Sequence, residues 1–565
     1  MIKIELNDWL FNAGLVGFYK ILQDSKANSE ALDISEVKIT KNCLEFDEKL
    51  IENFEDKYFG FFIKNYINFT PYGKIVGNRE KLQKWKESLE NFDEKNLKEF
   101  NDITKFTKDK LARNSYKGAY ALIEEKFDVL GVSKGLGTIK LNKGQSISEL
   151  EDDIQKQIEI MLQLMDWIEK PHIKRLLLSK EFTYTFTSDF FSNVAIWGKT
   201  NASKNPYTVF NEFFVEPFFK YNEADKSKFK NSCINCEKKV NSQFETGLTW
   251  INAMGADSAK KPAHYWNFNS DISVCPICTL IYSCIPAGFQ YLNGKGFFIN
   301  SNNRVKEIIA LNTPKYSLFS EEKFSIENLE LRSYFDIANA MGNKSQENFD
   351  LELDNIQVVK FDSGNAKRPY TFNVLNKKNA YIIYKSQKLL ECILTSRIKL
   401  SEKEYMIPYE EVIKRLFANK NLFDLIHKLI CLNSLFVANV VMNIQSNIVK
   451  IKKEGTYMYK DIVKSREIGF ALRRKYEAAD VIKKVDTITY KLLNALKVKS
   501  SNKFLDIVIN SYMSFGSSIP DVFLQTLMNE DKLLHVGYAF VLGLKGEVKD
   551  KEKQEDNQTI GGTEV

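Results

Sequence analysis

Two C-x-x-C pairs, Cys233-Ile-Asn-Cys236 and Cys275-Pro-Ile-Cys278, constrain the fold of this chain most strongly. The two-residue gap within a pair lets both thiolates turn toward one ion. Together the pairs supply a tetrahedral shell of four sulfurs, which suits zinc. Four thiolates leave no open position for a catalytic water, so we expect the zinc to be structural and to organise a loop-rich insert. A thioredoxin-like redox site needs only one such pair in a βαβ setting, which the flanking sequence does not offer.

The size and charge of the chain leave the class of partner open. A chain of 565 residues predicts several domains. Its 80 Lys and Arg against 73 Asp and Glu give a net charge of +7, too small a surplus to indicate a nucleic-acid partner by itself. The N-terminus has no secretory pattern and no run of 18 apolar residues occurs, so we expect a cytoplasmic protein without a membrane contact. In a reducing compartment, eight cysteines favour metal binding over disulfides.

The pattern of apolar residues and turns predicts an α+β fold with an irregular mixed N-terminal region, a four-cysteine zinc insert and a C-terminal antiparallel helical bundle. A helix is expected over residues 7–22, capped by Asn7 or Asp8, with close packing at Gly14 and Gly17. A charged helical segment is expected over 78–113. Strand-like pieces are expected from about 126 (FDVLGVSKGLGTIKLNKG) and at 181–187, 290–299 (with a turn at Asn293-Gly294) and 355–361.

After residue 400 the sequence becomes helical, beginning with a helix at Pro408. Further helices are expected over 459–483, 486–498, 503–512 and 520–544, the last one starting at Ser518-x-x-Asp521. The predicted domains are an N-terminal α+β part (1–230), the zinc insert (231–290), a continuation of the α+β part (291–400), the bundle (401–545) and a disordered tail (546–565).

Motifs that resemble catalytic sites are incomplete. Gly198-Lys199-Thr200 looks like the end of a phosphate-binding loop, but position 193 is Asn where that motif needs glycine. The four histidines form no metal-binding pattern. We therefore expect no enzyme; a hydrolase that uses Cys284 and His264 remains an alternative.

Positive charge is concentrated between residues 441 and 510, which hold 15 Lys and Arg against 7 Asp and Glu. Arg466, Arg473, Arg474 and Lys475 stand on one expected helix, and the spacing of the first three predicts a shared face. Such a face would suit a nucleic-acid backbone. The alternative is an ordinary solvated helix face. Lysine and asparagine also gather in the loop 198–205, where they could meet phosphates and base edges.

Three features together resemble one family. The opening ELNDWLFNAGLVGFYKIL, the C-I-N-C…C-P-I-C pairs followed by TLIYSCIPAGFQYL, and the basic helical C-terminus are similar to the Cst-type large subunit of type I-B CRISPR interference complexes (Cascade). The resemblance extends over nearly the whole chain, with these features in the same order, and the cysteine pairs are its most specific part.

The resemblance implies a subunit that is not an enzyme. It implies contact with guide RNA (crRNA) and with backbone, handle-binding and small subunits. It further implies recognition of a short protospacer-adjacent motif in double-stranded DNA, help in R-loop formation, binding of the displaced single strand and recruitment of a helicase–nuclease. Our candidates for reading the motif are Lys134, Lys199, Asn201, Lys204 and Asn205.

The family also implies a small subunit translated from within the gene. Met406, Met442 and Met458 are possible starts, and we favour Met458 because Lys452-Lys453-Glu454-Gly455 precedes it. The runner-up function is a zinc-containing RNA-binding scaffold outside CRISPR systems.

Overall fold

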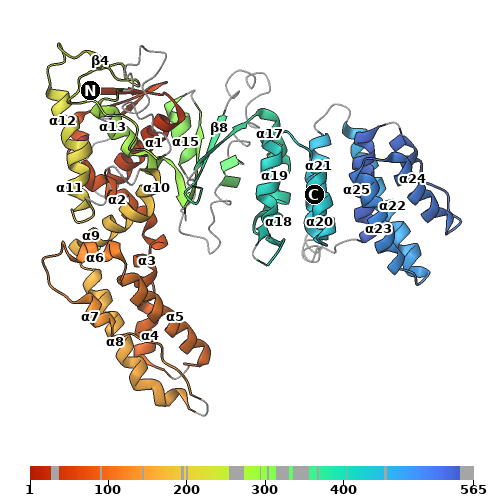
Figure 1. Cartoon of the computed structure of the whole chain (residues 1–565), viewed down its shortest axis with the longest axis horizontal. Coiled ribbons are helices and arrows are strands. Elements are labelled where there is room, and N and C mark those ends of the chain that lie inside the picture. The colour runs from red at the N-terminus through yellow and green to blue at the C-terminus, as the bar shows by residue number, and fades with distance from the viewer. Residues whose placement is uncertain are drawn as a thin grey trace, which may run out of the picture. The chain divides into compact units, whose positions relative to one another are not determined.

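The structure, a computed structural model, describes residues 1–546 apart from 27–36, 90–91, 143–144, 192–195, 197, 199–200, 253–272, 293, 302–303, 314–329, 332, 335–355, 366–367, 403, 451–454 and 528. The chain forms two compact units (Figure 1): unit 1 comprises Met1–Ser333 and Asn355–Asn373, and unit 2 comprises Tyr334–Asp354 and Val374–Val565. Helices and strands mix in unit 1, and helices dominate unit 2. This confirms the expected α+β class with a helical C-terminal region; the finer division into five segments stays a prediction.

Unit 1 holds three groups of strands, β1-β3-β2, β4-β5 and β6-β7-β8-β9, although the last two residues of β9 belong to unit 2. The pairs β1-β3, β2-β3, β4-β5, β6-β7 and β7-β8 are antiparallel. The strands are β1 (Ile2–Glu5), β2 (Lys38–Ile39), β3 (Cys43–Phe46), β4 (Asn231–Ser232), β5 (Lys239–Val240), β6 (Gln290–Leu292), β7 (Lys295–Asn300), β8 (Ile356–Asp362) and β9 (Tyr370–Leu375). The α-helices are α1 (Trp9–Lys26), α2 (Phe54–Tyr66), α3 (Pro71–Val76), α4 (Arg79–Glu87), α5 (Glu94–Leu111), α6 (Asn114–Tyr120), α7 (Val129–Ser133), α8 (Glu151–Ile168), α9 (Pro171–Phe182), α10 (Ser188–Phe190), α11 (Pro206–Phe210), α12 (Glu216–Glu223), α13 (Pro276–Ser283), α14 (Ile285–Gly288) and α15 (Val305–Asn312).

Helix α1 lies in the core of unit 1, as its glycines predict. The Asp8 carboxylate accepts hydrogen bonds from the backbone N–H groups of Leu10 (2.8 Å) and Phe11 (2.9 Å), so Asp8 caps the helix. A Cβ atom at Gly14 would lie 2.4 Å from the carbonyl oxygen of Ile281, and one at Gly17 would lie 1.9 Å from that of Cys284. The two glycines therefore let α1 approach the backbone of α13 and α14 directly.

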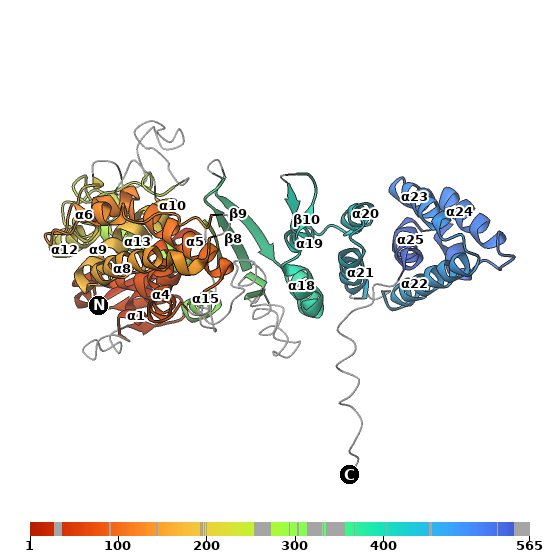
Figure 2. The ribbon, with the colours of Figure 1, turned by 90° about the horizontal axis from the view of Figure 1, so that it is seen from below.

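The expected strands at 290–299 and 355–361 are confirmed. β6 and β7 form a hairpin whose turn includes Gly294 with φ of +82°, a conformation that favours glycine. β7 pairs with β8 from Lys295↔Asp362 to Asn300↔Gln357. Figure 2 shows β8 and β9 side by side at the end of this sheet.

The expected strand at 181–187 is wrong, because Thr183–Thr187 forms a π-helical stretch that continues α9. The alternation of threonine and aromatic residues imitates a strand. Instead, the threonine hydroxyls donate to backbone carbonyls four residues earlier, as Thr183 does to Ser179 (2.7 Å). Phe182 and Phe186, four residues apart, both pack against Phe62 of α2. Helical packing against α2 thus outweighs the β propensity of the segment.

The segment 126–143 is also not a strand. It contains the short helix α7. The extended residues after α7 form hydrogen bonds with side chains, whereas a strand would form them with the backbone of a neighbouring strand. The Asn101 amide of α5 accepts from the Ile139 N–H (2.8 Å) and donates to the Ile139 carbonyl (2.9 Å). Lys108 Nζ donates to the carbonyl of Leu136 (2.6 Å). No alternation signal in a sequence reveals such side-chain partners.

Unit 2 contains a helical bundle after a short hairpin (Figure 2). Its elements are α17 (Lys377–Lys385), α18 (Gln387–Leu394), β10 (Ile398–Lys399), β11 (Tyr405–Met406), α19 (Pro408–Phe417), α20 (Phe423–Cys431), α21 (Leu435–Lys450), α22 (Gly455–Ala478), α23 (Lys483–Lys497), α24 (Ser501–Met513) and α25 (Glu530–Lys545). Helix α25 is buried from Leu533 to Leu544 and packs against α20, α21, α22 and α23.

The last helix starts later than its sequence signals predict. Residues 521–527 form a 3-10 helix, and α25 begins at Glu530, where the Asn529 side chain accepts from the Lys532 N–H (3.1 Å). The other expected bundle helices agree with α22, α23 and α24 to within a few residues. The predicted disordered tail lies outside the described residues, except for Gly546.

Candidate metal centre and nucleic-acid surfaces

The structure brings the four predicted cysteine ligands together. The Sγ atoms of Cys233, Cys236, Cys275 and Cys278 all lie within 4.8 Å of one another. The sulfurs of Cys236 and Cys275 are 3.5 Å apart. A tetrahedral zinc with sulfur bonds of about 2.3 Å needs sulfurs about 3.8 Å apart, so the arrangement fits a zinc ion. Among the described residues, this is the one cluster of His, Cys, Asp and Glu with metal-binding geometry.

Each pair of cysteines is positioned by its own backbone element. The hairpin β4-β5 carries the first pair, and Glu237 turns the chain with φ of +58°. Cys275 precedes α13 as its N-cap, and Cys278 lies in the first turn of this helix. The Cys275 N–H donates to Cys233 Sγ (3.3 Å), which supports a thiolate at that sulfur. A helix N-terminus favours negative charge, so α13 suits the thiolates of the second pair.

The metal centre is joined to the N-terminal helix by polar contacts. Asn7 Nδ2 donates to Asn235 Oδ1 (3.2 Å), and Asn235 Nδ2 donates to the Tyr282 hydroxyl (3.0 Å). Tyr282 of α13 also packs edge-on against Phe11 of α1, with ring centroids 5.3 Å apart. The opening helix and the cysteine pairs are far apart in sequence, but they pack directly against each other in the fold.

Cys284 is not placed as a nucleophile. Its thiol is fully buried, lies within hydrogen-bonding distance of the Leu280 carbonyl (Sγ to O 3.4 Å), and has its pKa raised by burial. His264, its partner in the hydrolase alternative, lies outside the described residues.

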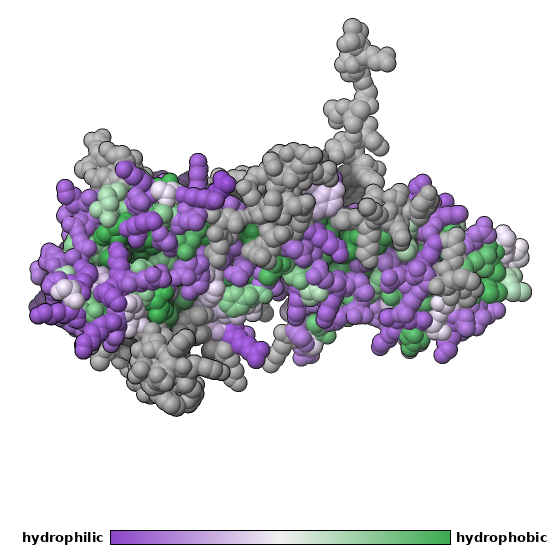
Figure 3. Space-filling model, turned by 90° about the horizontal axis from the view of Figure 1, so that it is seen from above, coloured by the Kyte–Doolittle hydropathy of each residue, from purple (hydrophilic) through white to green (hydrophobic). Residues whose placement is uncertain are grey.

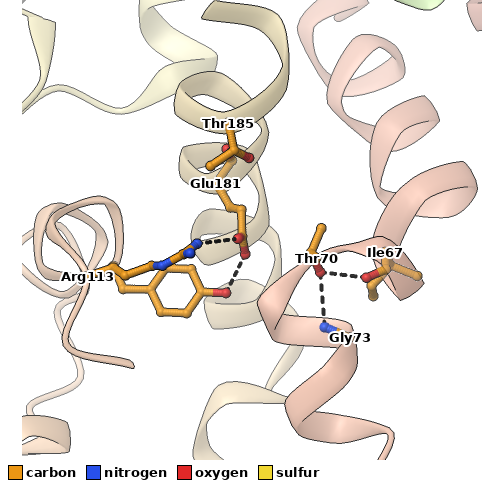
Figure 4. Close-up of polar contacts among 7 residues, drawn as sticks. Ile67, Thr70, Gly73, Arg113, Glu181 and Thr185 are labelled. Carbon is orange, nitrogen blue, oxygen red and sulfur yellow. Dashed lines mark hydrogen bonds and ion pairs between the residues drawn. The ribbon is translucent and has the colours of Figure 1, made fainter. Parts of the chain in front are cut away.

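Glu181 is a buried carboxylate, but its contacts hold helices together. It is 1% exposed, and burial raises the pKa of its carboxyl group. The Tyr116 hydroxyl of α6 donates to it, and Arg113 Nη1 lies 3.6 Å from Oε1 (Figure 4). Nearby, Thr70 caps α3 by accepting from the Gly73 N–H (3.0 Å). The network joins α6 to α9.

Residues 201–205, the last part of the loop 198–205, are held by a buried lysine that sequence reasoning missed. Lys180 of α9 is 1% exposed, and its Nζ donates to the carbonyls of Ala202 and Lys204 (2.6 Å each). Burial lowers the pKa of Lys180 to about 8. The local sequence does not single out this role, because Lys180 stands between Ser179 and Glu181.

The predicted loop residues differ in what they offer to a ligand. Asn201 Nδ2 donates to the Ile196 carbonyl (2.9 Å), and Asn205 Oδ1 caps α11 by accepting from the Tyr207 N–H (3.1 Å). Lys204 is exposed and pairs with Glu212 (3.6 Å). Lys134 is exposed at the end of α7, and Lys199 lies outside the described residues. The two asparagines thus each use part of their amide to shape the loop.

Arg466, Arg473 and Arg474, which the sequence predicts on a shared face, differ in what they offer to a ligand. Arg466 is half-buried and donates to Asn443 Oδ1 of α21 (2.9 Å), and burial lowers its pKa. Arg473 donates to the carbonyls of Leu544 (3.3 Å) and Lys545 (2.8 Å) at the end of α25. Arg474 instead lies exposed, with its guanidinium 4.5 Å from the centre of the Phe470 ring.

A different face of α22 carries the exposed positive charge. Because a helix turns 100° per residue, Lys460, Lys464, Arg474 and Lys475 fall within one sector of about 100°, whose edge at Arg474 lies about 80° from Arg466 and about 100° from Arg473. All four are exposed, and Glu467 is the acidic residue among them. We call these four residues the α22 cationic face. Figure 3 shows hydrophilic side chains over much of the end formed by the C-terminal helices, with hydrophobic ones between them. Tyr490 of α23 is also strongly exposed, at 68%.

One segment of the chain matches a known protein family. Residues 226–290, which carry all four cysteines, match the family model described as CRISPR-associated protein (Cas_CXXC_CXXC). No curated protein matches the chain. Within the described residues, no helix has the length and apolar character needed to cross a membrane.

Proposed function

We propose that this chain is the large subunit of a guide-RNA-directed antiviral DNA surveillance complex and is similar to the Cst-type subunits of type I-B systems. The match of the four-cysteine segment to a CRISPR-associated family carries this proposal. The zinc would be structural, since four thiolates close its coordination shell. The proposed protein is cytoplasmic and catalyses no reaction; base pairing with the guide reads sequence, and the protein reads only a short motif and the backbone.

The proposal assigns the loop 198–205 and Lys134 to the protospacer-adjacent motif. Two observations support this assignment. Lys180 fixes the loop backbone, so that side chains such as Lys204 stand on a rigid support. Lys134 and Lys204 are also exposed and suited to phosphate contact.

The proposal assigns the displaced DNA strand to the α22 cationic face and gives the exposed Tyr490 of α23 the role of a stacking platform. Lysine and arginine suit the phosphates, and an exposed tyrosine can stack on a base without sequence preference. R-loop formation and recruitment of the helicase–nuclease belong to the same proposal and rest on the family resemblance alone.

Charge removal tests this surface. Changing Lys460, Lys464, Arg474 and Lys475 to Gln removes four phosphate contacts, so the log–log slope of single-strand affinity against salt should become shallower by about 2.8. Titration of a fluorescent single strand at several salt concentrations measures the slope.

The matched control removes the same charge elsewhere. Changing the exposed residues Lys84, Lys95, Lys98 and Lys105 of α4 and α5 to Gln should leave the slope near that of the unmodified protein. An equal effect of both sets, or none of either, would show that α22 does not hold the strand. Arg473 is unsuitable for this test because its loss would uncap α25.

A separate short product starting at Met458 remains part of the proposal. Such a product would begin inside α22 and lack α20 and α21, which cover part of α25. Tyr538 of α25 stacks on Phe423 of α20, with ring centroids 5.5 Å apart, and would lose this cover. We therefore expect the short product to bury that side of α25 against another protein surface.

A further inference from the structure

Unit 1 contains a cavity of about 580 Å³ beside the end of the loop 198–205. Three segments line this cavity, namely the start of α9, residues 122–125 after α6, and the start of α11. Helix α9 packs against both α6 and α11 (Figure 1). Every lining residue belongs to unit 1. The cavity is therefore a feature of one compact unit.

The cavity has an apolar part that a ligand can reach. Leu122, Ile123 and Leu176 line it, and each of these side chains is half-buried rather than enclosed in the core. The volume lies within the range of about 300–1,000 Å³ that is typical of ligand sites. A flat apolar group in the cavity would cover the three side chains and remove them from water.

Arg175 brings a planar cation to the cavity in a fixed position. Its guanidinium carbon lies 4.2 Å from the centre of the Tyr207 ring, and its Nη2 pairs with Asp56 of α2. The Tyr207 ring packs in turn against Phe59, with ring centroids 4.7 Å apart. Arg175 remains half-exposed and lines the cavity, so part of its side chain can meet a ligand. Unpaired nucleobases stack on such guanidinium planes.

The rest of the lining offers hydrogen-bond acceptors and donors. Glu124 and Glu125 carry carboxylates, and Asn205 carries an amide whose Oδ1 already caps α11. Glu125 pairs with Lys170 and lies 3.5 Å from His172 Nε2, whereas Glu124 is exposed. Two carboxylates disfavour a phosphate inside the cavity. The amino and imino groups of a nucleobase, in contrast, donate hydrogen bonds to carboxylates.

We propose that this cavity holds an unpaired base of a DNA strand whose backbone follows residues 201–205. Lys204 is exposed, directly precedes Asn205 of the cavity, and suits the phosphate next to that base. Lys180 of α9 donates to the carbonyls of Ala202 and Lys204, so the same helix supports the loop and the cavity. The site rests on the proposed role of the loop in DNA binding and adds to it a place for one unstacked base.

Ultraviolet cross-linking of the full chain tests whether a base enters the cavity. The probe is a forked DNA duplex that carries 5-iodouracil in its unpaired arms, with randomised sequence next to the fork. The α22 cationic face is neutralised in this protein by changing its residues to Gln, so that α22 does not compete for the unpaired arms. Mass spectrometry should locate a cross-link within residues 171–176 or 205–207, which include the cavity residues of α9 and α11.

Fluorescence anisotropy of the same probe separates two kinds of failure. If the DNA binds but no cross-link lies on the cavity residues, the base site is refuted, while the role of the loop in DNA binding stands. If the protein does not bind the probe even in dilute buffer, the role of the loop fails, and the base site fails with it.

Variants of the lining locate the base. Leu176→Trp fills the cavity and should lower the yield of the cross-link about tenfold, since stacking of one base contributes about that factor to affinity. Leu162→Trp, at a half-buried leucine of α8 outside the cavity, should leave the yield unchanged. Glu124→Ala removes a carboxylate that repels DNA, yet it should also lower the yield, because the base loses an acceptor.

Two results with these variants would refute the site. One is an unchanged yield in Leu176→Trp. The other is a higher yield in Glu124→Ala, which would show that general attraction to the phosphates places the base. Because Glu124 is exposed, its variant tests the site even if Leu176→Trp fails to fold.

Discussion

Replacing Cys275 with Ser is expected to remove the metal and to unfold the segment that the four cysteines hold. A structural zinc contributes about 10–16 kcal/mol at neutral pH, which is comparable to the whole stability of an ordinary domain. The segment is also joined to α1 through Asn235 and Tyr282, so its loss should lower the melting temperature of unit 1. Elemental analysis of protein purified without chelator, followed by thermal unfolding, measures both effects.

The control for this experiment is Cys431→Ser. Cys431 is exposed at the end of α20 and lies outside the metal cluster. This variant should keep about one zinc per chain and the melting temperature of the unmodified protein. If the Cys275→Ser protein is metal-free but melts like the unmodified protein, or if the unmodified protein carries no metal, zinc is not the organiser of this segment.

The second large effect concerns the contact between α1 and α14. Gly17→Ala would place a Cβ atom 1.9 Å from the Cys284 carbonyl oxygen and 2.7 Å from the Gly288 nitrogen. Both neighbours are backbone atoms, so the helices must move apart, at a cost of about 1–3 kcal/mol or more. We expect a clear fall in the urea midpoint of unfolding.

Gly60→Ala is the matched control, since Gly60 also lies inside a helix, α2. No atom lies within 4 Å of a Cβ built at Gly60. Alanine there should stabilise the protein by about 0.5–1 kcal/mol through its higher helix propensity. Opposite shifts of the two midpoints are predicted, and shifts of the same sign would contradict the close packing of α1.

Much of the site could be predicted because its signals are local. The spacing of the cysteines predicted the cluster, and Gly14 and Gly17 predicted a close contact of α1 whose partner the sequence did not reveal. The hairpin of β6 and β7 could be predicted because Asn293-Gly294 is a turn sequence that only a few backbone conformations accommodate. Each of these signals lies within a few residues of sequence, although the contacts that it predicts join distant segments.

The missed features depend on contacts between distant segments. Threonine bonds and aromatic packing against α2 turn Thr183–Thr187 into a π-helical stretch, and the side chain of Asn101 replaces a strand partner for Ile139. The spacing of Arg466 and Arg473 did not reveal that both side chains form hydrogen bonds with neighbouring helices. The helical angle places Arg474 about 80° from both Arg466 and Lys464, so it does not separate the two groups. The contacts of Arg466 with α21 and of Arg473 with α25 do.

Affinity purification of the tagged chain from its host tests the central claim most directly. If the chain is the large subunit of a guide-RNA-directed complex, a short RNA carrying CRISPR repeat sequence and a backbone subunit present in several copies should copurify, as sequencing and mass spectrometry will show. Copurification of other RNAs without repeat sequence would indicate the zinc-containing RNA-binding scaffold instead. Recovery of the chain without any RNA would contradict both functions.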